Sequence, residues 1–181
     1  MKLHLVRHPR PSVAPDVCYG ATNVPVLDAE LTRVQAALTA AGLPGRLPVY
    51  ASPLQRCAAL ARRLQPQRLV FDKRLAEMDF GAWELRRWDT IPRADVDAWT
   101  ADLLHYRPGG AENVLDVAHR VAAFAADLRA SGEPEALVIC HAGTIRLLCA
   151  MQDGLPLEQA ALRAAKTPHR IGHGDVVTLK A

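Results

Sequence analysis

Short apolar runs alternate with longer amphipathic stretches along this chain. Five of the runs are typical of buried strands, at residues 3–6, 48–51, 68–71, 136–140 and 175–179. Apolar residues at helical spacing predict helices over residues 31–41, 52–64, 95–105, 113–130 and 144–151. Strands that alternate with helices predict an α/β fold, here a three-layer α/β/α sandwich with a mostly parallel sheet.

Two segments carry more specific signals. At the start of the second helix, Ser52 is a good N-cap and Pro53 suits the first helical position. The segment at about 75–110 interrupts the alternation and holds all three tryptophans and several prolines. We expect this segment to form a small helical cap over a site. The cap would be an insertion within a single domain covering residues 1–181.

Polar clusters follow three of the predicted strands. Arg7 and His8 follow the first strand, the cluster at 52–56 follows the second, and His141 follows the strand at 136–140. In open parallel sheets, ligands bind outside the carboxyl ends of the strands. We therefore expect the three clusters to converge at one edge of the sheet.

Charge and cysteine content exclude several classes of protein. The 22 basic and 19 acidic residues leave a net charge of +3, which indicates neither a nucleic-acid partner nor a membrane surface. No apolar run approaches 18 residues, so we expect no membrane span. The four cysteines form no C-x-x-C pair and no Cys/His group has zinc-ligand spacing, so we expect no metal site. Free thiols and the lack of an apolar signal-peptide core after Met1 favour a cytoplasmic location.

The residues of the three clusters suit the transfer of a phosphoryl group. Such a group carries up to two negative charges, and its transfer needs cationic and hydrogen-bond-donating groups around the nonbridging oxygens. Arg7, Arg56, His8 and His141 would supply them. A nucleophilic histidine also needs a nearby acid to protonate the leaving oxygen, and Glu77 is our candidate. Asp79 and Glu84 are the neighbouring alternatives.

Five motifs in family order resemble those of the histidine phosphatase superfamily, which includes the phosphoglycerate mutases. Arg7-His8 resembles the R-H-G motif, and the 52–56 sequence SPLQR is similar to S-P-x-x-R. The 75–84 sequence resembles the acid-bearing motif, the 108–112 sequence PGGAE the P-G-G-E segment, and the 140–143 sequence CHAG the second-histidine motif. Together they cover nearly the whole chain.

This resemblance implies a metal-independent phosphomonoesterase that needs no cofactor and acts on a small phosphorylated metabolite. It implies that His8 is the nucleophile that becomes phosphohistidine. It also implies that Arg7, Arg56 and His141 bind the phosphoryl oxygens, and that Glu77 is the general acid and later the base that activates water.

The sequence departs from the family pattern at several positions. Pro9 replaces the usual Gly, and Ala14 stands where an Asn is expected. One expected ligand of the phosphoryl oxygens is therefore absent, or is replaced by Arg10 or Ser12. The 18–25 sequence CYGATNVP resembles the C-Y-G-x-T-D-x-P segment of alpha-ribazole phosphatases, the cobalamin-pathway branch, with Asn23 in place of Asp. The best specific expectation is therefore hydrolysis of alpha-ribazole 5′-phosphate or a related small phosphomonoester.

Two other functions remain open at this point. A phosphoglycerate-type mutase would use the same residues, although the 84–110 segment is poor in the extra basic residues that a substrate carboxylate would need. A phosphate-binding module without catalysis would explain Pro9 and the lost Asn.

His169 and His173 stand four residues apart, but Pro168 and Gly172 disfavour the helix that would align them on a metal. The aromatic residues of the cap favour packing, and an aromatic-lined cap would also suit a substrate that carries an aromatic base.

Overall fold

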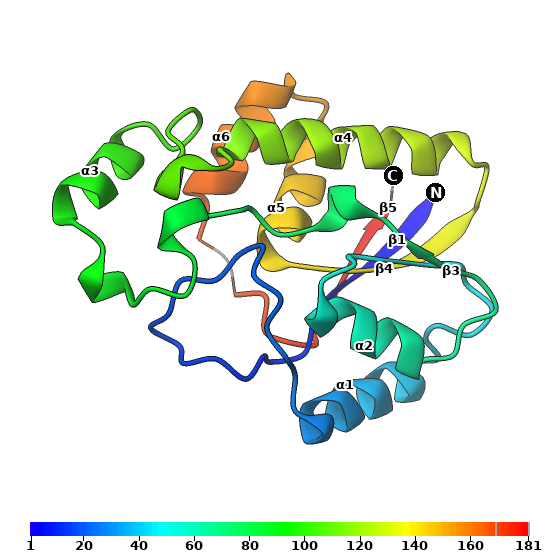
Figure 1. The fold of residues 1–181 in the computed structure, drawn as a ribbon. Coiled ribbons are helices and arrows are strands. Elements are labelled where there is room, and N and C mark those ends of the chain that lie inside the picture. The colour runs from blue at the N-terminus through cyan, green and yellow to red at the C-terminus, as the bar shows by residue number, and fades with distance from the viewer. Residues whose placement is uncertain (169, 181) are drawn as a thin grey trace.

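A computed structural model describes residues 1–168 and 170–180, and its centre is a five-stranded sheet (Figure 1). The strand order is β3-β2-β4-β1-β5. The strands are β1 (Lys2–Arg7), β2 (Val49–Ala51), β3 (Leu69–Phe71), β4 (Glu135–Cys140) and β5 (Val176–Lys180). β1 to β4 run parallel, and β5 pairs antiparallel with β1 at the sheet edge.

Helices cover both faces of this sheet. Alternate strand residues point to opposite faces, so Leu3 and Leu5 pack with one layer and Val6 with the other. Helices α1 (Asp28–Ala40) and α2 (Gln55–Arg63) form the second layer. Helices α4 (Val114–Ala130), α5 (Ala142–Ala150) and α6 (Leu157–Lys166) form the first. The predicted three-layer α/β/α sandwich with a mostly parallel sheet is thus confirmed.

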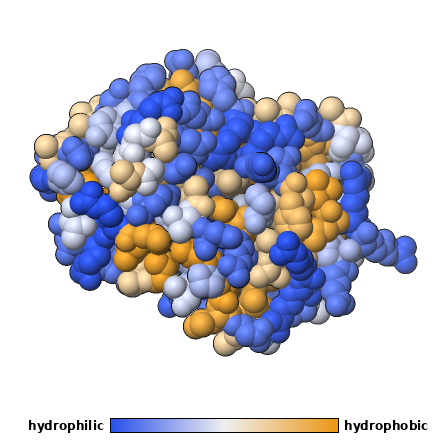
Figure 2. Space-filling view, in the orientation of Figure 1, coloured by the Kyte–Doolittle hydropathy of each residue, from blue (hydrophilic) through white to orange (hydrophobic). Residues whose placement is uncertain are grey.

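The segment between β3 and α4 lies mostly beyond the sandwich (Figure 1). It contains helix α3 (Arg93–Ala101) and four short 3₁₀ turns, at Lys73–Leu75, Gly81–Trp83, Trp88–Thr90 and Pro108–Gly110. Trp83 is buried in a small separate cluster with Cys18 and Ile91. Hydrophilic residues cover most of the face drawn in Figure 2, and apolar residues gather there in a few separate patches.

The structure corrects three details of the sequence prediction. Ser52 is not the N-cap of α2, because the helix begins later, after Leu54, and the Ser52 hydroxyl is instead 2.9 Å from His141 Nε2. Helix α3 ends at Ala101 rather than at 105, because Asp102 leaves helical geometry and its carboxylate accepts the N–H of His105. Helix α6 was not predicted at all.

Helix α6 has a buried face made of alanines and a polar face on its other side. Ala160, Ala161 and Ala164 pack against the core, and only Leu157 adds a larger apolar side chain to that face. Within residues 1–168 and 170–180, no helix is both long and apolar enough to cross a membrane.

Candidate active site

The three predicted polar clusters meet at the carboxyl edge of the sheet. Arg7 is the last residue of β1 and His8 follows it, His141 links β4 to α5, and Arg56 lies in the first turn of α2 after β2. β2, β4 and β1 are adjacent in the sheet. The rings of His8 and His141 are consequently 5.1 Å apart, and Arg56 Nε is 3.3 Å from His141 Nδ1.

His8 is held as a neutral imidazole with a defined tautomer. Its Nδ1 lies 2.7 Å from the carbonyl oxygen of Pro9. A carbonyl can only accept a hydrogen bond, so Nδ1 carries the proton and Nε2 keeps its lone pair. Burial, and after it the positive charge of Arg56, hold the pKa of His8 well below its usual value. The replacement of Gly by Pro at position 9 keeps the carbonyl on which this geometry depends.

Arg56 and His141 form a buried pair behind His8. Both side chains are fully inaccessible to solvent. Arg56 Nε donates to His141 Nδ1, so the ring proton of neutral His141 is on Nε2, which donates to Ser52 Oγ. Burial and the charge of Arg56 hold the pKa of His141 well below its usual value. The two remaining Arg56 nitrogens donate to the carbonyls of Gly20 and Thr22.

Arg7 lies beside His8 in the same polar group. Its Nη1 donates to the Ile171 carbonyl at 2.5 Å, while its Nε is buried with no hydrogen-bond partner in the described part of the chain. Buried donors in native proteins nearly always have a partner, so an unpartnered guanidinium N–H in a cavity wall is suited to an anion.

Glu77 reaches this group from the segment after β3. Its carboxylate accepts the Gly143 N–H at 3.2 Å, in the first turn of α5, where the helix dipole favours an anion. A Cβ at position 143 would overlap the Glu77 carboxylate, so glycine is required for this approach.

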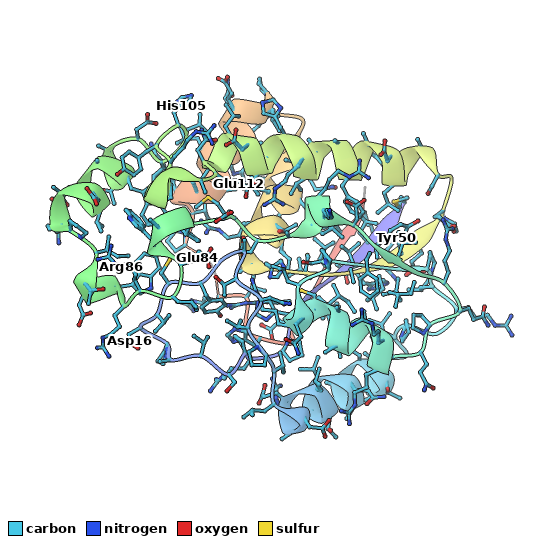
Figure 3. All side chains as sticks on the ribbon, viewed as in Figure 1. Asp16, Tyr50, Glu84, Arg86, His105 and Glu112 are labelled. Atoms are coloured by element: carbon cyan, nitrogen blue, oxygen red, sulfur yellow. The ribbon has the colours of Figure 1, made fainter. Side chains whose placement is uncertain are left out.

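Arg120 of α4 holds the backbone that carries Glu77. Its guanidinium donates to the carbonyls of Arg74, Ala76 and Glu77 and pairs with Glu112 at 2.9 Å. The other Glu112 oxygen accepts the N–H of Asp79. Glu112, which is labelled in Figure 3, therefore helps to position Glu77 although it does not line the cavity itself.

The two alternatives to Glu77 have other partners. Glu84, also labelled in Figure 3, accepts hydrogen bonds from the backbone N–H groups of residues 20–22 and from the Thr22 hydroxyl. Although burial would raise the pKa of the Glu84 carboxyl, these donors hold it below its usual value. Asp79 accepts the N–H of Gly81. Of the three carboxylates, Glu77 is the one that lines the cavity.

A cavity of about 510 Å³ extends from this polar group toward the 75–110 segment. Arg7, His8, Arg56 and Glu77 line its polar end. The rest of its wall is mainly apolar and includes Val17, Met78, Phe80, Trp88, Trp99, Leu103, Val114, Val117 and Leu147. The rings of Trp88 and Trp99 stack nearly parallel, and Phe80 meets Trp99 edge to face. Two of the three tryptophans thus face the cavity as well as pack.

His173 was not among the predicted site residues, and its ring centroid lies 5.3 Å from that of His8. It is close to the nucleophile without itself lining the cavity. Burial and the charge of Arg7 lower the pKa of His173 to about 4. Arg10 and Ser12, the expected replacements for the missing Asn, are exposed and do not line the cavity. His169, considered with His173 as a metal pair, lies outside the described residues. Among the residues that the structure describes, no group of three His, Cys, Asp or Glu side chains is placed to hold a metal ion.

Comparisons with known proteins point in one direction. A model of the histidine phosphatase superfamily (branch 1) matches residues 3–169. The adenosylcobalamin/alpha-ribazole phosphatase of Escherichia coli (strain K12) is 29% identical over 172 residues, which span 87% of this chain and 82% of that protein. A Hydrogenobacter thermophilus protein with a phosphoserine phosphatase name is 27% identical over 116 residues, 61% of this chain but 57% of that protein. The crystal structure of the alpha-ribazole phosphatase from Shigella flexneri matches with a TM-score of 0.83 at 25% identity, over 99% of this chain and 90% of that one.

The lowered pKa values of three histidines predict that the free energy of unfolding decreases as the pH is lowered. His8, His141 and His173 are neutral in the folded protein, and each takes up a proton on unfolding once the pH is below about 6.5, the value for an unfolded chain. The unfolded state then binds more protons, so the free energy of unfolding falls by up to about 1.4 kcal/mol per pH unit for each imidazole. Urea denaturation at intervals between pH 7.5 and 5.5 measures this slope. His173→Asn should reduce this slope by the contribution of about one proton taken up on unfolding. A free energy of unfolding that does not change with pH in the wild type would contradict the assignment of three neutral histidines.

Proposed function

Because this chain belongs to the histidine phosphatase superfamily (branch 1), we propose that it hydrolyses phosphomonoesters through a phosphohistidine at His8. The phosphoryl group would pass first from the substrate oxygen to His8 Nε2 and then from His8 to water. The first step breaks the bond between phosphorus and the leaving oxygen and forms one between phosphorus and nitrogen. The second step forms a bond between phosphorus and the water oxygen, breaks the bond to nitrogen and releases inorganic phosphate, while Glu77 takes the proton of the water.

The state of His8 supports its role as the nucleophile. Attack on phosphorus needs an unprotonated nitrogen, and the Pro9 carbonyl holds the ring proton on Nδ1, away from Nε2. Burial and Arg56 keep the ring neutral by lowering its pKa. No separate base is then needed to activate the nucleophile.

The cationic groups around His8 would stabilise the charge on the transferring phosphoryl group. Arg7 has a buried Nε without a partner among the described residues, and Arg56 brings a second guanidinium to the same end of the cavity. Donors that are already in place and withdrawn from water stabilise developing charge without reorganisation. His141 does not line the cavity, and its ring nitrogens contact Arg56 and Ser52, so it would join this set by exchanging one of those contacts for a phosphoryl oxygen.

Glu77 would protonate the leaving oxygen and later accept a proton from the attacking water. It lines the polar end of the cavity together with His8, where it would be near the leaving oxygen of a bound phosphomonoester. The Arg120 and Gly143 contacts limit the movement of this carboxylate. A general acid in this position typically contributes about 10²–10⁴-fold to the rate.

The apolar wall of the cavity is the observation that carries the substrate assignment. Phe80, Trp88 and Trp99 offer aromatic faces to a leaving group. Arg146, a cation in this wall, donates to the carbonyls of Ala165 and Thr167 at the C-terminal end of α6. Carbonyls do not neutralise this cation, so the preference for a flat aromatic leaving group rests on the aromatic faces of the wall and not on Arg146.

We therefore propose alpha-ribazole 5′-phosphate, or a close relative with an aromatic base, as the substrate. The name of the Escherichia coli relative supports this choice and supports a role in cobalamin biosynthesis. The 75–110 segment would act as the cap that covers the base. The four free thiols of the chain are consistent with the reducing cytoplasm that we propose as the location.

The covalent intermediate gives the first test. Rapid quenching with ³²P-labelled substrate should trap protein-bound phosphate that is labile to acid and stable to base, as a phosphoramidate is. His8→Ala should remove both the label and turnover while the protein remains folded. His119→Ala, a change at an exposed position of α4, should keep both. Label that survives acid would indicate a serine or threonine ester and would reject His8 as the nucleophile.

The role of Glu77 is tested by varying the leaving group. Glu77→Gln keeps an acceptor for the Gly143 N–H but has no proton to give. Its burst rate should fall by about 10²–10⁴-fold on alpha-ribazole 5′-phosphate, whose alkoxide is a poor leaving group. On 4-nitrophenyl phosphate the loss should be much smaller, because nitrophenolate leaves without help. Equal losses on both substrates would make Glu77 a positioning residue, and Asp79→Asn is the matched control that should affect neither.

A substrate panel tests the proposed leaving group. The value of kcat/KM should be higher for alpha-ribazole 5′-phosphate than for phosphoserine, 3-phosphoglycerate or glycerol 3-phosphate. Trp99→Ala should lower kcat/KM about tenfold for the aromatic substrate, the scale of a lost stacking contact, and change it little for glycerol 3-phosphate. Greatest activity on phosphoserine, interconversion of phosphoglycerates, or phosphate binding without any turnover would each contradict the proposal.

A further inference from the structure

The antiparallel direction of β5 brings a third histidine to the carboxyl edge of the sheet. β5 lies beside β1 and runs the opposite way, so the residues just before it are next to the residues just after β1. His141 follows β4 on the other side of β1. The order of the strands therefore gives a row of imidazoles, His141, His8 and His173, with ring separations of 5.1 and 5.3 Å.

The turn that carries His173 is tied firmly to β1 and α1. The Gly174 N–H donates to the Arg7 carbonyl, and the Arg7 N–H donates to the Asp175 carbonyl, both at 3.0 Å. The carbonyl of His173 itself accepts from Arg33 of α1 at 3.1 Å. Gly174 has a φ of +89°, and a Cβ there would lie 2.6 Å from a Val34 methyl group. The position of His173 is thus determined by its surroundings rather than by its own side chain.

The side chain of His173 has an unmet hydrogen-bonding group. Within the described residues, three buried side-chain nitrogens have no partner: Arg7 Nε, Trp99 Nε1 and His173 Nε2. Two of the three belong to neighbours of the nucleophile. Arg7 precedes His8 in the chain, and the His173 ring lies beside the His8 ring. A buried nitrogen without a partner costs free energy in the unliganded protein, and such groups in native structures call for a specific cause.

We propose that His173 is a ligand of the phosphoryl group at His8, with Nε2–H donating to a nonbridging oxygen. This inference rests on the proposed function, because it assigns a further residue to the same site. Neither the motifs nor the spacing of the sequence assigns His173 this role. An anion bound at His8 would satisfy both orphaned nitrogens, those of Arg7 and His173, with a single ligand.

The surroundings of His173 fit a donor to an anion better than a packing residue. Among the described residues, no hydrogen bond joins the His173 ring to the His8 ring, so His173 Nε2 is not satisfied by the nucleophile. Burial, and after it the positive charge of Arg7, keep His173 neutral by lowering its pKa. A phosphoryl oxygen can only accept, so it would select the tautomer with the proton on Nε2. Hydrogen bonds to charged acceptors are also stronger than those between neutral groups.

Binding of inorganic phosphate, measured by isothermal titration calorimetry at pH 7, separates this role from others. His173→Ala should weaken phosphate binding about 10- to 100-fold, the usual effect of losing a hydrogen bond to a charged group. His173→Asn, which restores a side-chain N–H donor, should recover most of that loss. His119→Ala should bind phosphate as the wild type does. Thermal unfolding of each variant reports separately on the fold.

Each outcome decides the question. Phosphate binding by His173→Ala within twofold of the wild type would overturn the inference and leave the proposed function intact. Equal losses in the Ala and Asn variants would make His173 a packing residue and would also overturn it. A wild-type protein that neither binds phosphate nor hydrolyses any phosphomonoester would overturn the proposed function itself.

Discussion

The burial of one cation, the Arg56 guanidinium, is the constraint on which the rest of the site depends. Its nitrogens donate to His141 and to the carbonyls of Gly20 and Thr22, so one side chain joins the end of β4 to the loop that precedes α1. Within the described residues, no carboxylate forms an ion pair with it. A buried charge with only neutral partners is unfavourable, and a bound phosphoryl dianion would offset that cost.

The same cation explains why the neighbouring histidines are neutral. Desolvation disfavours imidazolium, and a nearby guanidinium disfavours it further, so the pKa values of His8 and His141 are both depressed. A neutral His8 is a competent nucleophile, whereas a protonated one is not. The buried Arg56 guanidinium therefore favours the binding of an anion and also keeps His8 in the neutral form that can attack phosphorus.

Two carboxylates, Glu84 and Glu112, organise the wall opposite the sheet without lining the cavity. Glu84 accepts the N–H groups of residues 20–22, and the carbonyls of Gly20 and Thr22 accept from Arg56. Glu112 pairs with Arg120, which in turn holds the backbone of Glu77. The loop before α1 and the segment after β3 are distant in the sequence, and these contacts fix both against the same edge of the sheet.

The sequence by itself determined the sandwich and most of the polar end of the site. Apolar runs of four or five residues and helical spacing are local signals, so β1, β4, α4 and the convergence of Arg7, His8, Arg56 and His141 could be predicted from them. Helix α6 was missed although its alanine face and its polar face contrast at helical spacing, which is also a local signal. The partner of Ser52, the tautomer of His8 and the place of His173 were decided by the tertiary structure. Each depends on a residue brought near by strand order, over 89 positions for Ser52 and His141, and a local pattern contains no information about such pairs.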